Sequence, residues 1–165
     1  MITVEQIISL LKLKPHPEGG FFSETYRSGE SIPGASLPSR YSGERAHSTA
    51  IYYLLAGENR SAMHRVRSDE IFHHYLGDPV EMLHLFPDGS GRIVILGPDL
   101  PGGMAPQVLI PHDSWQGARL VPGGAFALMG ATVSPGFDFS DFELGERGAL
   151  TARYPEFRDL ITALT

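Results

Sequence analysis

The sequence predicts an all-β fold, an antiparallel sandwich or barrel of short strands with one short helix at each end. Many short stretches alternate apolar and polar residues with the period of two that is typical of strands. Glycine and proline turn signals separate these stretches, and only the two ends of the chain carry apolar residues at helical spacing. Because the chain has 165 residues, 42% of them hydrophobic, and no low-complexity tract, we expect a single domain over residues 1–165.

The first helix is predicted by a capping box, in which Thr3 precedes Gln6 by three residues. An apolar stripe at helical spacing follows: Val4, Ile7, Ile8, Leu10 and Leu11. The helix is expected to end near residues 14–17, because prolines there disfavour a helical backbone.

A strand is predicted over residues 21–27. Regular alternation would place Phe22, Glu24 and Tyr26 on one face and Arg27 on the other. Residues 28–47 are rich in Gly, Ser and Pro and show no clear period, which is long for a connection inside a compact domain. Three roles stay open for this loop: closing over a pocket, reaching a partner subunit, or lying on the surface as a solvated loop.

Eight further strands are predicted, at 49–55, 62–66, 70–76, 80–86, 92–96, 108–110, 115–121 and 126–133. Alternation alone does not distinguish a sandwich from a barrel. The final helix is predicted from Tyr154, with Pro155 at its first position. Its apolar residues are Phe157, Leu160, Ile161 and Leu164.

Composition excludes several functional classes. A net charge of −6 with 13 scattered basic residues argues against a nucleic-acid partner, which requires clustered Lys and Arg. The absence of Cys excludes disulfides and thiol catalysis. No signal segment or membrane-length apolar run is visible, so we expect a cytoplasmic protein without a membrane partner.

The candidate site lies in the predicted strand pair over residues 61–77. Folding the two strands together brings Glu70 towards His64, and Phe72 and His74 share the face of Glu70. An imidazole and a carboxylate that converge in a concavity form either a metal site or an acid–base pair. Alternatively, His64 is a hydrogen-bonded core histidine.

These residues resemble the first motif of the cupin superfamily. His64 holds the first histidine position, Val66 replaces the second histidine, Glu70 holds the glutamate and Gly77 closes the motif. Residues 111–116 resemble the second motif, with Gln116 at the last histidine position. The resemblance implies a double-stranded β-helix, a jelly-roll barrel open at one end. It also implies a candidate metal set of His64, Glu70 and Gln116.

Longer blocks resemble the uncharacterised Cupin_5 family: residues 16–28, 48–55, 64–70 and 135–144. That resemblance covers almost the whole chain and implies a homodimer. The last block carries Asp138, Asp141 and Glu143. These acids either lie at a solvated barrel rim or orient a pocket histidine or a substrate hydroxyl.

Residues 20–26, followed by a strand histidine, are similar to deoxysugar 3,5-epimerases of the cupin superfamily. The similarity implies that His64 is a base that removes a proton next to a ketone. The tyrosine that returns the proton stays open among Tyr26, Tyr52, Tyr53 and Tyr75. Gly20 stands where these epimerases have an arginine, which argues against a nucleotide diphosphate ligand.

The function predicted from the sequence is binding of a small, polar, carbohydrate-like molecule in the barrel. In an isomerase or epimerase, His64 would be the general base and Glu70 would orient it or the ligand. This function requires no cofactor. The expected ligand-binding residues are Phe22, Glu24, Phe72, His74, Trp115 and Gln116. Two alternatives are a non-catalytic binding protein and an enzyme with a divalent metal held by His64, Glu70 and Gln116.

Overall fold

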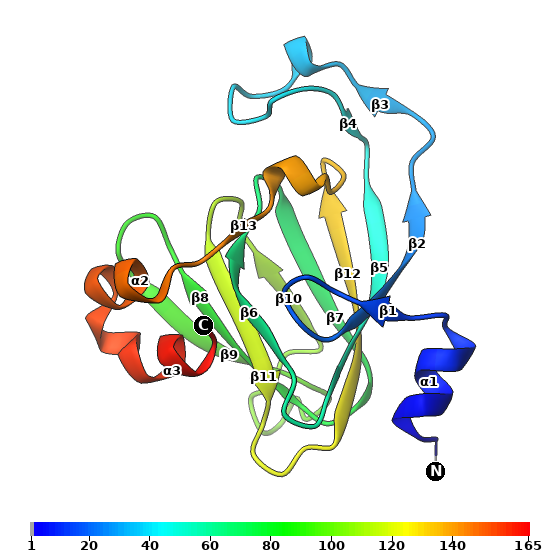
Figure 1. The fold of residues 1–165 in the computed structure, drawn as a ribbon, viewed down its shortest axis with the longest axis vertical. Coiled ribbons are helices and arrows are strands. Elements are labelled where there is room, and N and C mark those ends of the chain that lie inside the picture. The colour runs from blue at the N-terminus through cyan, green and yellow to red at the C-terminus, as the bar shows by residue number, and fades with distance from the viewer. Residues whose placement is uncertain (1) are drawn as a thin grey trace.

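A computed structural model describes residues 2–165 of the chain. Two antiparallel sheets face each other (Figure 1). The six-stranded sheet has the order β1-β2-β5-β12-β7-β10, and the five-stranded sheet has the order β13-β6-β11-β8-β9. The six-stranded sheet contains β1 (Lys14–Pro15), β2 (Phe21–Arg27), β5 (Thr49–Ala56), β7 (Asp69–Gly77), β10 (Gln107–Ile110) and β12 (Phe126–Ser134). The five-stranded sheet contains β6 (Arg60–Arg65), β8 (Val80–Leu85), β9 (Gly91–Leu96), β11 (Trp115–Leu120) and β13 (Glu143–Leu144).

All nine strands predicted from alternation are present, with ends that differ by at most two residues. The inward side chains of the two sheets meet in a common apolar core that includes Leu55 and Met129 from one sheet and Met82 and Leu120 from the other. Packing between two facing sheets explains the alternation, because one face of each strand is buried against the other sheet. The all-β jelly-roll prediction is confirmed.

Register shifts interrupt three strand pairings, β2 with β5, β7 with β12 and β6 with β11, and the first of them changes a predicted face. The pairing of β2 with β5 shifts register between Glu24 and Tyr26, so Thr25 is an extra residue in β2. A bulge reverses which face the following residues occupy. The expectation that Tyr26 shares a face with Glu24 is therefore wrong. Tyr26 is 53% exposed, and Arg27 lines the interior cavity together with Phe22 and Glu24.

Helix α1 (Val4–Leu10) covers part of the outer face of the six-stranded sheet. The predicted capping box is present, with Thr3 and Gln6 bonding each other's backbone. Ile7 and Leu13 pack against Leu54 and Leu128, which point outwards from β5 and β12.

The carboxyl-terminal segment covers the outer face of the five-stranded sheet. It contains α2 (Arg147–Arg153), the 3-10 turn η3 (Pro155–Phe157) and α3 (Arg158–Ala163). Their side chains form a second apolar cluster with Met63, Leu83 and Leu85. Helix α2 was not predicted. Glu146 caps it by accepting from two backbone N–H groups, but its seven residues carry a weak apolar period.

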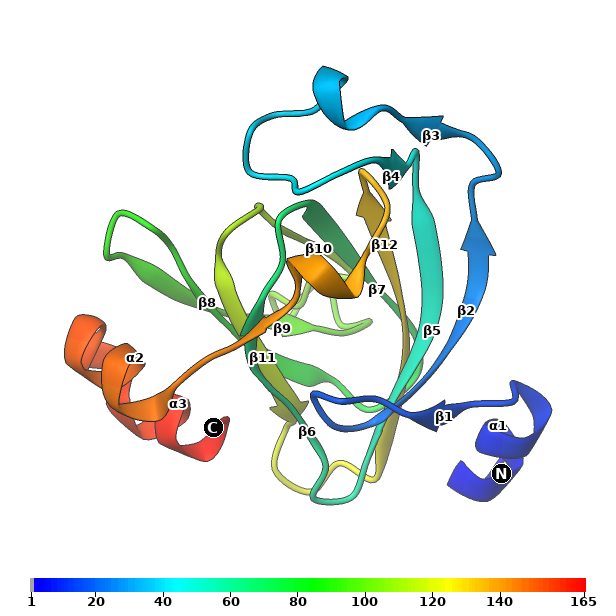
Figure 2. The same cartoon turned by 45° about the horizontal axis from the view of Figure 1, so that its top comes forward.

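Residues 28–47 project beyond the end of the barrel as an arm (Figures 1 and 2). Its two short strands, β3 (Ser31–Ile32) and β4 (Arg45–Ala46), pair with each other and enclose the 3-10 turn η1 (Gly34–Ser36). Tyr41 and Arg45 in this arm are buried. None of the helices in residues 2–165 has the length and apolar character needed to cross a bilayer.

Candidate functional site

A cavity of about 180 Å³ lies inside the barrel, between the two sheets. Its walls come from both sheets, from the turn between β1 and β2, and from residues 137–142, which include the 3-10 turn η2 (Phe139–Asp141). The lining residues are His16, Glu18, Phe22, Glu24, Arg27, Thr49, Ile51, Tyr53, His64, Val66, Glu70, Phe72, Ala131, Val133, Phe137, Asp138, Phe139 and Phe142.

His64 and Glu18 form the buried polar centre of this cavity. His64 Nε2 lies 3.2 Å from Glu18 Oε2, and the two side chains are 3% and 7% exposed. Ser61 Oγ donates to the other carboxylate oxygen, Glu18 Oε1, at 2.8 Å. The carboxylate is thus held at both oxygens, which fixes it against the imidazole.

The backbone decides which nitrogen of His64 faces Glu18. His64 Nδ1 lies 2.7 Å from the carbonyl oxygen of Ala62, an acceptor, so Nδ1 carries a proton. A favourable contact between Nε2 and Glu18 Oε2 then requires one further proton, shared between the imidazole and the carboxyl group. Phe142 stacks on the His64 ring at 5.4 Å between centroids and covers the pair.

Two glycines bring Glu18 to this position. Gly19 and Gly20 have φ of +108° and +66°, a region that other residues rarely adopt. A Cβ on Gly19 would collide with the carbonyl oxygen of Arg60 at the start of β6. Ala62 N donates to the carbonyl oxygen of Glu18 at 2.8 Å, so the turn lies directly on β6. The Glu-Gly-Gly turn therefore places the carboxylate beside His64.

Glu70 projects into the cavity from the opposite sheet. Gln116 Nε2 donates to Glu70 Oε2 at 2.6 Å. Burial raises the pKa of Glu70 to about 7, with help from the charge of Glu18, while His64 and Gln116 act in the opposite direction. At neutral pH this carboxyl group is therefore divided between its neutral and ionised forms.

Two further polar side chains lie beside the Glu18 turn. Burial lowers the pKa of His16, whose Nδ1 accepts from Glu18 N at 3.2 Å and whose ring meets Phe22 edge-on. Burial also raises the pKa of Tyr53 well above its ordinary value, and its hydroxyl donates to the carbonyl oxygen of Gly19 at 2.7 Å. Of the four tyrosines left open as proton donors, only Tyr53 lines the cavity.

The structure places the residues predicted for the site in three groups. Five of them line the cavity: Phe22, Glu24, His64, Glu70 and Phe72. Gln116 lies behind Glu70 as its hydrogen-bond partner. His74 and Trp115 lie outside the lining, because His74 Nε2 faces the carbonyl oxygen of Asp78 and Trp115 packs towards the carboxyl-terminal helices. Adjacent strand residues face opposite sides, so Trp115 and Gln116 do not share the interior.

The partner of His64 differs from the expected one. Within residues 2–165, no hydrogen bond or ion pair joins His64 to Glu70, and Glu18 stands in that place. His16 and Glu18 were not predicted as site residues, although both lie in the 16–28 block that resembles Cupin_5. The sequence of this block indicates the family, but it does not show that the block folds against β6, which is what brings Glu18 to His64.

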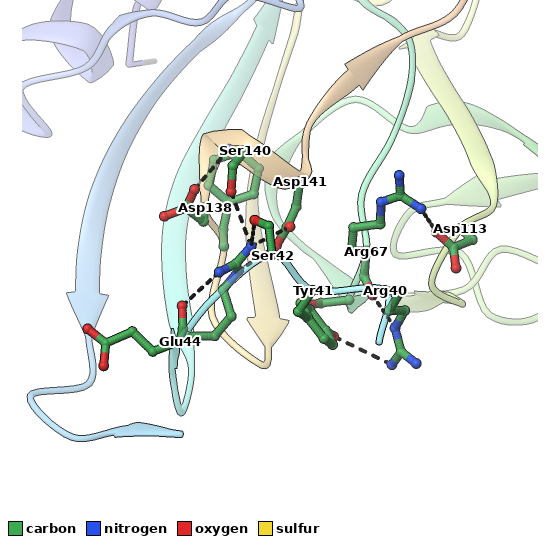
Figure 3. A network of polar contacts seen from close by, with 12 residues as sticks. Arg40, Tyr41, Ser42, Glu44, Arg67, Asp113, Asp138, Ser140 and Asp141 are labelled. Atoms are coloured by element: carbon green, nitrogen blue, oxygen red, sulfur yellow. Dashed lines mark hydrogen bonds and ion pairs between the residues drawn. The ribbon is translucent and has the colours of Figure 1, made fainter. Parts of the chain in front are cut away.

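The three acids of the 135–144 block lie in different surroundings. Asp138 lines the cavity mouth and caps η2 by accepting from Ser140 N. Asp141 is buried and forms a bidentate pair with Arg45 of the arm, at 2.7 and 2.6 Å. Glu143 lies outside, paired with Arg65. Arg45 also donates to Ser140 Oγ, and Figure 3 shows these contacts between the arm and the segment around η2. The arm therefore anchors the segment that contributes Phe139 and Phe142 to the cavity wall.

The three residues of the expected metal set are paired with protein groups. Val66 supplies no donor atom, Gln116 turns its amide nitrogen to Glu70, and His64 faces Glu18. In the described part of the chain, no group of three or more His, Asp or Glu side chains is arranged to hold a metal ion. The residues present do not fit the metal centre that the cupin motifs imply.

A model of the family described as "Cupin superfamily (DUF985)", Cupin_5, matches residues 5–145. The chain belongs to the Cupin_5 family. This match confirms the resemblance seen in the sequence blocks.

One curated relative is similar in sequence, and two solved structures are similar in sequence and fold. A curated protein of Saccharomyces cerevisiae, "Uncharacterized protein YML079W", is 29% identical over 84% of this chain and 73% of its own length. The solved structure of protein SO0799 from Shewanella oneidensis is 34% identical with a TM-score of 0.88, covering 100% of this chain and 98% of that one. A hypothetical protein from Leishmania major is 29% identical with a TM-score of 0.89, covering 99% of each chain.

Proposed function

We propose that this Cupin_5 protein binds a small, polar, carbohydrate-like molecule in the barrel cavity and transfers a proton to or from it, as an isomerase or epimerase does. The observation that carries the proposal is the contact of 3.2 Å between His64 Nε2 and Glu18 Oε2 at the wall of a cavity lined largely by aromatic rings. Small-ligand sites commonly combine an apolar wall with a few converging polar groups.

Proton transfer next to a carbonyl needs one group that takes a proton and one that returns it. The His64–Glu18 pair reaches the cavity from β6 and the β1–β2 turn, and Glu70 reaches it from β7 in the other sheet. Because the pKa of Glu70 is about 7, Glu70 both donates and accepts near neutral pH. The two groups act on a ligand held between them.

Hydrogen exchange tests this proposal. The protein is incubated in deuterated water with dihydroxyacetone, D-erythrulose and D-fructose, and NMR follows deuterium at the carbon next to the carbonyl. We expect exchange that is lost in His64→Ala and Glu18→Gln. Exchange should persist in His74→Ala, a matched control whose imidazole lies outside the cavity.

The second candidate function is non-catalytic binding of a small metabolite. It is favoured by the engagement of both His64 nitrogens with protein groups, because Nδ1 faces Ala62 and Nε2 faces Glu18. Saturable binding of one of these ketoses without any deuterium incorporation would establish this function and refute the isomerase proposal.

Metal-dependent chemistry remains the third candidate and is tested by measuring the metal content of protein purified without added metal. Near-stoichiometric metal that is lost in both His64→Ala and Glu70→Ala would replace the metal-free proposal. A divalent ion would then take donors that this geometry keeps paired with each other.

We also propose a homodimer. The outer face of the six-stranded sheet keeps large apolar side chains that α1 does not cover, among them Tyr26, Tyr75, Leu76 and Leu109, which are about half exposed. Sedimentation equilibrium tests this proposal, and a monomer at all accessible concentrations would refute it.

A further inference from the structure

The cavity carries an excess of acidic groups. Four acidic side chains line it, and Arg27 is the one lysine or arginine among its lining residues in the described chain. Arg27 is already engaged, since its guanidinium donates to both oxygens of Glu24 at 3.0 and 2.8 Å and to the carbonyl oxygen of Phe137 at 3.1 Å. A negatively charged ligand would therefore meet repulsion and find no unpaired lysine or arginine.

Among the described residues, one buried acidic oxygen in the cavity is left without a partner. Glu70 is 8% exposed, and only its Oε2 accepts a hydrogen bond, from Gln116. Among residues 2–165 nothing donates to Glu70 Oε1, and this atom is not sealed from the cavity. Glu18 differs, because Ser61 and His64 engage both of its oxygens. A ligand donor would satisfy Glu70 Oε1, and a charged donor would form the stronger bond.

The rest of the wall consists mainly of aromatic rings. Phe22 and Phe72 come from the six-stranded sheet, and Phe137, Phe139 and Phe142 come from the segment around η2. The faces of such rings carry negative potential and attract cations, most strongly where water is excluded. Two independent features, an unpaired buried carboxyl oxygen and a phenylalanine wall, thus favour the same ligand charge.

We propose that the ligand of this cavity carries a protonated amino group, as an amino sugar or amino polyol does, and that the ammonium lies against Glu70 and the phenylalanine wall. This inference rests on the proposed binding of a small polar molecule and adds the charge of that molecule. The hydroxyl groups of such a ligand would face the polar side of the cavity at Glu18 and His64.

Three six-carbon polyols that differ only at one end test the charge. D-glucamine ends in an ammonium group, D-sorbitol in a neutral hydroxyl and D-gluconate in a carboxylate, and calorimetric or NMR titration measures each dissociation constant. We expect D-glucamine to bind roughly tenfold more tightly than D-sorbitol, the gain of one charge-assisted contact, and D-gluconate to bind most weakly.

Glu70→Gln tests the contact itself, because it keeps the shape of the side chain and removes its charge. We expect the advantage of D-glucamine over D-sorbitol to be lost in this variant. The matched control is Glu81→Gln, whose carboxylate pairs with Arg119 away from the cavity and whose loss should leave the advantage unchanged. The ligand ranking uses the unmodified protein and so tests the inference even if Glu70→Gln does not fold.

The outcomes separate this inference from the function on which it rests. Equal binding of D-sorbitol and D-glucamine, or preference for D-gluconate, would overturn the ammonium inference and leave binding of a small polar molecule standing. If Glu70→Gln still bound D-glucamine more tightly than D-sorbitol by the same factor, the ammonium group would not lie against Glu70. Failure of all three polyols to bind would overturn the ammonium inference alone, because the exchange experiment with the ketoses tests the proposed function separately.

Discussion

The interior of the barrel has two halves, to both of which strands β5, β7 and β12 contribute. In one half, Leu55, Met82, Leu120 and Met129 form a closed apolar core. In the other half, the inward positions carry His64, Glu70 and Gln116, and Glu18 enters from a turn. Buried polar groups cost stability unless they are paired, whereas buried apolar groups stabilise. The comparison teaches that this chain places polar groups where a continued core would be more stable, which is typical of a functional site.

The largest expected effect lies at the rim of the polar half. Arg45→Ala leaves Asp141 buried without its partner, so the free energy of unfolding should fall by about 3–5 kcal/mol. Urea denaturation measures this change. Arg65→Ala is the matched control, because its pair with Glu143 is more exposed, and it should cost less than about 1 kcal/mol. Equal losses in the two variants would show that burial of the arm contact contributes nothing.

A substitution in the apolar half should change the stability of the protein through lost packing and leave ligand binding unchanged. Leu55→Ala removes a fully buried side chain and should lower the free energy of unfolding by about 2–5 kcal/mol. Ligand affinity should stay unchanged, because Leu55 does not line the cavity. A large loss of affinity in the folded variant would contradict the division of the interior into two halves.

The polar half should also make stability depend on pH. The pKa of Glu70 is raised to about 7 in the folded protein. The contribution of its protonated form to the free energy of unfolding is therefore fully present below about pH 4.5, and it is lost as the pH rises through about 7. Glu70→Gln removes this titration. The variant should gain up to about 3 kcal/mol relative to the unmodified protein between pH 4 and pH 8. Denaturation curves across this range measure the difference, and a constant difference would refute the raised pKa.

The smallest effect is expected for His74→Ala. It removes the contact of His74 with the carbonyl oxygen of Asp78 and should cost about 0.5–1.5 kcal/mol. Ligand binding should not change, although the sequence predicted His74 as a ligand-binding residue. A selective loss of binding in this variant would restore that prediction.

The strands and the helical regions at both ends could be predicted because they follow from the pattern of residues close together in the chain. The family could be recognised because its motifs are continuous blocks of sequence. Sequence reasoning located His64, Glu70, Phe22 and Phe72 through period and motif spacing. It placed Trp115 in the cavity beside Gln116, although adjacent strand residues face opposite sides, and the covering carboxyl-terminal helices show which of the two faces inwards. It placed Tyr26 inwards because the bulge at Thr25 leaves no clear signal in the residue pattern.

The sequence by itself determined the alternation of the strands, the turns between them and the capping box of α1, since these follow from local backbone preferences and period. Only the tertiary structure decided that Glu18, rather than Glu70, faces His64, and that Arg45 holds the wall around η2. Those contacts join segments far apart in the chain. Their geometry depends on how the two sheets pack, which no local preference specifies.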